Sequence, residues 1–216
     1  MSEKKELIIG LVKNAVKDFA VPSVTEFARF HDPYLVLVSC ILSLRTKDKV
    51  TVERANALFA KAKSPQEMLG ISSERIAKII YPVGFYHTKA EVIRNLSKII
   101  IRDYKSKVPD TREDLLKIKG IGPKTAALVL GLGFNIPAIC VDTHVHRVSN
   151  RLGWVVTKRP EDTEGALEKI IPKKYWIGLN TWFVAFGQHI CMPVSPYCSN
   201  CPIEKHCLKK GVLKSR

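Results

Sequence analysis

Four cysteines near the C-terminus constrain this chain more than any other feature. Cys191, Cys198, Cys201 and Cys207 follow the spacing C-x6-C-x2-C-x5-C. Four thiolates this close in sequence can surround one metal centre, either a tetrahedral zinc ion or a four-iron cluster. The long first gap favours a 4Fe–4S cluster, because structural zinc sites usually pair cysteines across short gaps. A zinc-knuckle binding protein remains the alternative.

The charge of the chain points to a partner. Its 216 residues carry 35 Lys and Arg against 20 Asp and Glu, a formal net charge of +15. An excess of this size favours a polyanion, and nucleic acid is the leading candidate. The alternative is a basic surface that serves only solubility, and composition does not separate DNA from RNA.

Hydrophobic patterning gives no sign of a membrane protein. No run of eighteen apolar residues occurs, and residues 1–10 lack the apolar core of a signal peptide. Cys40 and Cys140 lie in apolar stretches, outside the four-cysteine motif. These two unpaired cysteines, together with four more held by a metal, predict a reducing compartment, and we expect a cytoplasmic monomer.

Proline and N-cap residues divide the sequence into helices. Asp32 precedes Pro33, and residues 64–67 form a capping box with proline at the first helical position. An amphipathic stripe runs from Thr88 to Tyr104, whereas strand-like alternation is absent. The predicted fold class is therefore all-α.

Residues 111–133 predict a helical hairpin. A short helix over residues 112–118 is followed by a glycine-containing turn and by a second helix that begins at Pro123. The turn residues are Lys119, Gly120, Ile121 and Gly122. The N–H groups at the start of the second helix can bind an anion, so the pattern is typical of hairpins that grip a DNA phosphate without reading sequence. An ordinary αα-hairpin is the alternative.

Two residues are candidates for chemistry. Lys124 lies in the first turn of the second helix, where the helix dipole, together with partial burial, would favour a neutral and nucleophilic amine. A lysine that only pairs with phosphate is the alternative. Asp142 follows an apolar stretch and opens another helix, where an Asp is most often an N-cap. Near the lysine, its carboxylate could instead take a proton and stabilise positive charge on a sugar.

Four motifs in order resemble those of one family. They are the segment GFYHTKA at residues 84–90, the hairpin at residues 118–126, VDTH at residues 141–144, and the cysteine spacing. Together they resemble the endonuclease III branch of the helix-hairpin-helix DNA glycosylases, over roughly residues 30–210.

The resemblance implies two helical domains with a DNA cleft between them. Residues 25–137 would form a six-helix domain with the hairpin, and residues 1–24 would join residues 138–216 in a domain that holds the 4Fe–4S cluster on the four cysteines. Double-stranded damaged DNA would be bent and one nucleotide flipped out. Lys124 would attack the sugar, expel the base and nick the strand by β-elimination. Asp142 would help to deprotonate Lys124.

The resemblance also implies a set of DNA-binding residues, in which three departures from the family occur. The set is Arg45, Phe85, Lys119, Gly120, Ile121, Gly122, Thr125 and His144. Arg45 stands where the family commonly has glutamine opposite the orphaned base, and a guanidinium favours guanine. Phe85 stands where a leucine wedge is common, so it either stacks on bases or belongs to the core. Residues 192–197 lack the family's basic residues, and Lys119, in place of a proline, would compensate.

Three functions remain open at this level. The lysine at position 124 favours a glycosylase with AP-lyase activity on oxidised pyrimidines such as thymine glycol, in the cytoplasm of a prokaryote and associated with the nucleoid. Arg45 instead supports a uracil or thymine mismatch glycosylase that acts opposite guanine. The third is a non-catalytic DNA-binding or redox-sensing protein.

Overall fold

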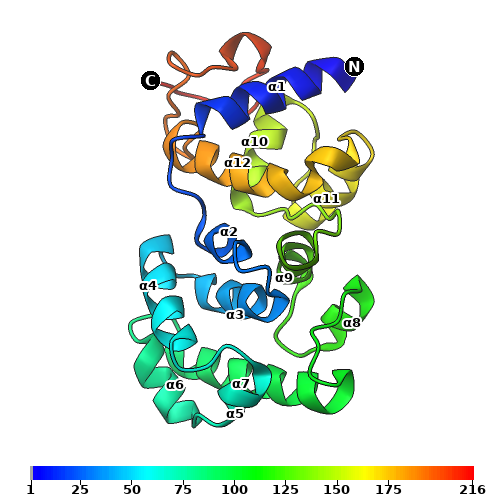
Figure 1. Cartoon of the computed structure of the whole chain (residues 1–216). Coiled ribbons are helices and arrows are strands. Elements are labelled where there is room, and N and C mark those ends of the chain that lie inside the picture. The colour runs from blue at the N-terminus through cyan, green and yellow to red at the C-terminus, as the bar shows by residue number, and fades with distance from the viewer. Residues whose placement is uncertain (1) are drawn as a thin grey trace. The chain divides into compact units, whose positions relative to one another are not determined.

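The computed structural model describes residues 2–216, and within that range the chain forms helices and loops without a strand. The predicted all-α class is confirmed. The chain divides into two compact units, Pro22–Ile136 and the pair of segments Met1–Val21 and Pro137–Arg216 (Figure 1). The boundaries expected from the sequence, at residues 24/25 and 137/138, lie close to these but do not coincide with them. No helix in the described chain combines the length and apolar character that spanning a bilayer requires.

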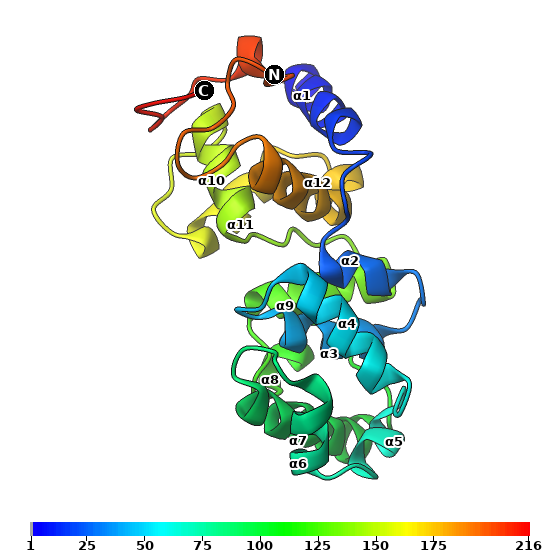
Figure 2. The same ribbon diagram turned by 90° about the vertical axis from the view of Figure 1, so that its left-hand side faces the viewer.

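The unit Pro22–Ile136 is organised around one buried helix. Its elements are α2 (Ser23–Ala28), α3 (Pro33–Ser43), α4 (Asp48–Phe59), α5 (Pro65–Leu69), α6 (Ser73–Ile80), α7 (Tyr86–Tyr104), α8 (Arg112–Lys117), α9 (Pro123–Leu128) and the π-helical turn η1 (Val129–Gly133). Helix α3 is buried from Tyr34 to Leu42. Helices α2, α4, α7 and α9 pack on it (Figure 2). An almost wholly apolar helix is stable only when it is covered on all sides.

Side-chain caps fix where these helices begin. Asp32 accepts hydrogen bonds from the N–H groups of the first turn of α3, and Ser64 and Glu67 form the predicted capping box of α5. Ser72 caps α6 and Thr111 caps α8. Each cap contributes about 1 kcal/mol. The caps place the loops that lie between the helices.

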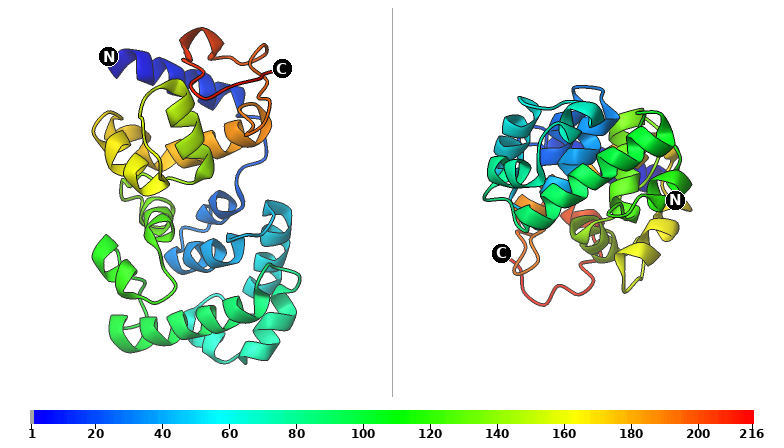
Figure 3. Two further views of the ribbon diagram at one scale, coloured as in Figure 1. Left: turned by 180° about the vertical axis from the view of Figure 1, so that it is seen from behind. Right: turned by 90° about the horizontal axis from the view of Figure 1, so that it is seen from below.

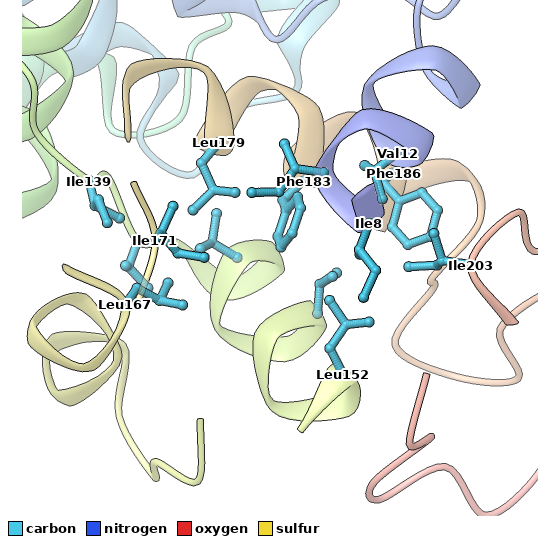
Figure 4. Packing of buried hydrophobic residues seen from close by; sticks show 14 of the residues in the cluster. Ile8, Val12, Ile139, Leu152, Leu167, Ile171, Leu179, Phe183, Phe186 and Ile203 are labelled. Carbon is cyan, nitrogen blue, oxygen red and sulfur yellow. The ribbon is translucent and has the colours of Figure 1, made fainter. Parts of the chain in front are cut away.

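The second unit contains α1 (Ser2–Ala15), α10 (Thr143–Leu152), α11 (Pro160–Glu168), the 3₁₀ turns η2 (Lys173–Tyr175) and η3 (Glu204–His206), and α12 (Trp176–His189). Helix α1 packs on α12 (Figure 3). The shared core includes Ile8, Leu152, Phe183, Phe186 and Ile203 (Figure 4). Burying each such side chain contributes about 1.5–3 kcal/mol. Because Ile203 joins this core, the core anchors the loop that carries the four cysteines.

Candidate functional site

The hairpin between α8 and α9 is a tight turn that requires glycine at one position. The N–H of Ile121 donates to the carbonyl of Ile118 at 3.1 Å, and both isoleucine side chains are buried. Gly120 between them has φ +100°, and a Cβ there would lie 2.9 Å from Cγ1 of Val92. Only glycine fits both the left-handed backbone and the close approach to α7. The turn therefore packs closely against Val92 of α7, which fixes its position.

The start of α9 is open. Gly122 is the N-cap with extended backbone, and a Cβ built on it would meet no atom within 4 Å. No side chain of the described residues caps this helix. The first N–H groups of a helix have no partner within it and carry the positive end of the helix dipole. Open space beside uncapped N–H groups suits an anion such as a phosphate.

The predicted hairpin residues differ in exposure. Lys119 and Lys124 are exposed, so the expected partial burial of Lys124 is wrong. Thr125 is buried, so its side chain belongs to the interior of the unit. Lys124 lies near Cys40 of α3: burial raises the pKa of that thiol to about 12, and the positive charge of Lys124 partly offsets this rise. The Lys124 side chain therefore lies at the surface of the unit.

Asp142 caps α10, as its position in the sequence predicts. Its Oδ1 accepts from the N–H groups of His144 and Val145, both at 2.9 Å. The segment before Asp142 is held in place, because Cys140 is buried and its carbonyl accepts a hydrogen bond from Nδ2 of Asn180 at 3.2 Å. Both capping bonds fall on one oxygen, so the carboxylate is held in one orientation.

Arg147, which no sequence motif singles out, connects α10 to the cysteine loop. Nη2 of Arg147 donates to the carbonyls of Gly187 and Cys191, both at 2.9 Å, and lies 3.1 Å from Nδ1 of His144. Burial lowers the pKa of Arg147 from its ordinary value. The imidazole of His144, a predicted DNA contact, is therefore already engaged within its own unit.

The four cysteines line a common pocket. Apolar side chains complete the wall, among them Val148, Leu152, Phe186 and Ile203. No three His, Cys, Asp or Glu residues of the described chain lie close enough to hold a single metal ion. Each cysteine of a 4Fe–4S cluster binds its own iron, so its four sulfurs need not converge on one point. A pocket lined by all four cysteines is therefore compatible with a 4Fe–4S cluster.

Hydrogen-bond donors already lie against these sulfurs. Nη1 of Arg151 donates to Sγ of Cys191 at 3.4 Å, and the backbone N–H of Lys209 donates to Sγ of Cys207 at 3.3 Å. Burial raises the pKa of the Cys201 thiol to about 11. N–H donors favour the thiolate form that metal binding requires. The donor set is therefore consistent with a cluster held by thiolates.

Arg45 and Phe85 form an exposed pair in the unit Pro22–Ile136. The guanidinium carbon of Arg45 lies 5.6 Å from the centroid of the Phe85 ring. The Phe85 side chain is 62% exposed, so the alternative that it belongs to the core is wrong. Both residues have left-handed backbone, with φ of 53° and 58°. Bulky side chains adopt this conformation rarely, and such outliers cluster at functional sites.

Comparison with known proteins gives consistent matches. Residues 38–173 match the family described as HhH-GPD superfamily base excision DNA repair protein. The chain is 44% identical over 195 residues to Endonuclease III of Thermotoga maritima, which covers 89% of this chain and 92% of that protein. A solved non-covalent Endonuclease III–DNA complex aligns with a TM-score of 0.83 at 32% identity over 95% of both chains. A thermostable thymine-DNA glycosylase aligns with a TM-score of 0.85 at 26% identity, also over 95% of both chains.

Proposed function

This chain belongs to the HhH-GPD superfamily of base excision DNA repair proteins and, within it, to the endonuclease III family, and from this premise we propose how its residues act. It is a base-excision-repair DNA glycosylase with AP-lyase activity that removes oxidised pyrimidines of the thymine glycol type. The observation that carries the proposed mechanism is the position of Lys124. This exposed lysine lies in the first turn of α9, a helix whose N-cap is Gly122 and which no side chain caps.

Binding of double-stranded DNA is the first step. The open start of α9 at Gly122 would take a phosphate of the damaged strand through backbone N–H groups. Lys119 adds a positive charge beside that phosphate, and the net charge of +15 favours the duplex at long range. These contacts carry no sequence information, as suits an enzyme that must search all DNA. We expect the protein to act as a monomer.

Excision needs the damaged nucleotide outside the base stack. Nζ of Lys124, as a neutral amine, would form a bond to C1′ of the sugar while the bond from C1′ to the base breaks. Asp142 would accept the proton from the lysine and stabilise the positive charge that develops on the sugar. The bond from C1′ to the ring oxygen O4′ then breaks, O4′ takes up a proton, and the nitrogen of Lys124 and C1′ form the double bond of a Schiff base. Loss of a proton from C2′ breaks the bond from C3′ to its oxygen and nicks the strand.

We propose that the four cysteines hold a 4Fe–4S cluster whose contribution is to cross-link the C-terminal loop. Their spacing, their shared apolar pocket and the N–H donors at two of the sulfurs support this cofactor. Excision and β-elimination transfer no electrons, so the chain's own residues suffice for them. Cys40 and Cys140 are buried thiols outside this set, which supports a reducing compartment, and we place the protein in the cytoplasm.

A mismatch glycosylase is the second candidate. Arg45 supports this candidate, because a guanidinium favours guanine as the opposite base. The similarity to a thymine-DNA glycosylase, at 26% identity, is a second observation in its favour. Lys124 argues against this candidate, because base removal by water needs no amine nucleophile. The two candidates therefore differ in the covalent step.

Two labelled duplexes separate the candidates, one with thymine glycol and one with an intact G·T mismatch. The proposed function predicts a nick at thymine glycol that Lys124→Gln abolishes while binding is retained. Thymine release from G·T, with thymine glycol left intact, would instead establish the mismatch enzyme.

A further inference from the structure

A large cleft opens in the unit Pro22–Ile136, beside the first residues of α3. Its volume is about 730 Å³, within the range of about 300–1,000 Å³ that ligand sites occupy. Cys40, which lies near Lys124, stands towards the opposite end of the same helix. The cleft is therefore separate from the residues proposed for excision.

The apolar part of the cleft is rigid. Two aromatic side chains and three prolines contribute to its lining: Tyr104, Phe134, Pro33, Pro65 and Pro109. Proline side chains have almost no rotamer freedom to lose when a ligand binds. Phe134 directly follows η1, a π-helical turn of a kind that is frequent at functional sites. The lining thus offers a preformed apolar surface, which lowers the cost of binding.

The backbone around the cleft is unusual. Of the eight non-glycine residues with left-handed backbone in the described chain, four line the cleft or adjoin a residue that does: His31, Lys105, Ser106 and Asn135. Such backbone is costly and recurs at ligand clamps. It is held in place here, because Nε2 of Gln66 in α5 donates to Oγ of Ser106, which follows α7.

The exposed part of the lining carries positive charge that no salt bridge neutralises. Lys63 and Lys107 line the cleft and are exposed, and neither ammonium group forms a salt bridge within the described residues. The exposed imidazole of His31 is a third basic group. The two lysines are therefore available to acidic groups of a ligand.

The carboxylates of the lining distinguish a peptide from a nucleic acid. Asp32 caps α3 and Asp114 forms a salt bridge with Lys117, so Asp110 is the remaining exposed carboxylate of the lining. A nucleic-acid backbone places an anion at every nucleotide and would meet these carboxylates, and no arginine is among the described residues that line the cleft. A peptide brings backbone N–H donors for such oxygens as well as acidic side chains for the lysines.

We propose that the cleft binds an extended, acidic segment of a partner protein. An apolar side chain of that segment lies on Tyr104 and Phe134, and its carboxylates pair with Lys63 and Lys107. Excision uses none of these residues. The inference therefore adds a docking site for another protein to the proposed function and does not depend on Lys124.

Selection from a phage-displayed library of random peptides tests the inference on the full chain. We expect the peptides enriched on the wild-type protein to share an apolar residue flanked by acidic ones. In fluorescence anisotropy at one salt concentration, the double variant Lys63→Gln, Lys107→Gln should bind the best of them about tenfold more weakly. The matched control Lys49→Gln, Lys78→Gln removes two exposed lysines that do not line the cleft, and it should change the affinity by less than about twofold.

Enriched peptides without acidic residues, or no enrichment at all, would overturn the inference. An equal loss of affinity in the two double variants would do the same, because the attraction would then come from net charge alone. A short single-stranded oligonucleotide that displaces the peptide, and that binds wild type but not Lys63→Gln, Lys107→Gln, would assign the cleft to nucleic acid instead. The peptide assay involves no excision, so failure of the wild type to nick thymine glycol would count against the proposed function and not against this inference.

Discussion

Nη1 of Arg151 donates a hydrogen bond to Sγ of Cys191 at 3.4 Å, which ties a nearly buried cation to one of the four cysteines. The same guanidinium donates to the carbonyls of Met192 (2.6 Å) and Pro193 (2.8 Å). The Arg151 guanidinium therefore holds the backbone at the start of the cysteine loop and also donates a hydrogen bond to one cysteine sulfur.

Arg151→Met should destabilise the unit that contains the cysteines by about 2–4 kcal/mol, because buried carbonyls lose charge-assisted hydrogen bonds. Iron content and the urea midpoint of unfolding should both fall. Arg159→Met is the matched control, since it removes an exposed ion pair with Asp162 and should cost at most about 1 kcal/mol. Equal midpoints for the two variants would contradict a special role for Arg151.

Asp142→Asn should distinguish the role of Asp142 as the cap of α10 from its proposed role in excision. Asparagine caps a helix about as well as aspartate, so the free energy of unfolding should change by less than about 0.5 kcal/mol. The excision rate should fall by roughly 10²–10⁴-fold, because the amide accepts no proton. Ser72→Ala is the control, as it removes the cap of α6 and should cost about 1 kcal/mol without slowing excision. A folded Asp142→Asn with the wild-type rate would leave Asp142 as a cap only.

The two hairpin glycines should respond differently to alanine. Gly120→Ala meets φ +100° and a contact of 2.9 Å to Val92, so it should destabilise the protein by about 1–3 kcal/mol. Gly122→Ala meets open space and should change stability by less than about 1 kcal/mol. Its methyl group should nevertheless weaken duplex binding in a fluorescence anisotropy titration, because it stands where the phosphate must approach. Unchanged affinity in Gly122→Ala would place the phosphate elsewhere.

Burial of Lys89 lowers its pKa, which predicts a pH dependence of stability. The folded value is about 8, and the unfolded value is the ordinary one of about 10.4. Between these two values the unfolded chain binds more protons, so this group makes the protein more stable as the pH rises through that window. Below about 8 it is charged in both states and contributes no slope. The difference in unfolding midpoint between wild type and Lys89→Met should therefore change above that pH, and parallel curves would contradict the assignment.

Much of the fold follows from local sequence chemistry. The caps at Asp32, Ser64 and Ser72, and the glycine turn before Pro123, act over three or four residues, and so a single sequence reveals them. The amphipathic helix predicted from Thr88 begins two residues earlier, at Tyr86, because Phe85 takes left-handed backbone just before it.

The remaining features depend on contacts that are distant in sequence. Lys89 binds carbonyls some 45 residues away, and Arg151 reaches a sulfur 40 residues away. Backbone carbonyls leave no trace in residue type, so neither role could be predicted. The burial of Thr125 and the exposure of Lys124 likewise depend on how α9 packs on α3.

The central claim is that Lys124 is the nucleophile, and borohydride trapping tests it most directly. Borohydride reduces a Schiff base to a stable amine, so a duplex with thymine glycol becomes linked to the lysine that attacked it. The account predicts a covalent complex whose peptide map places the DNA on Lys124, lost in Lys124→Gln and kept in Lys98→Gln. A link that maps to another residue, or strand cleavage that persists in Lys124→Gln, would contradict it.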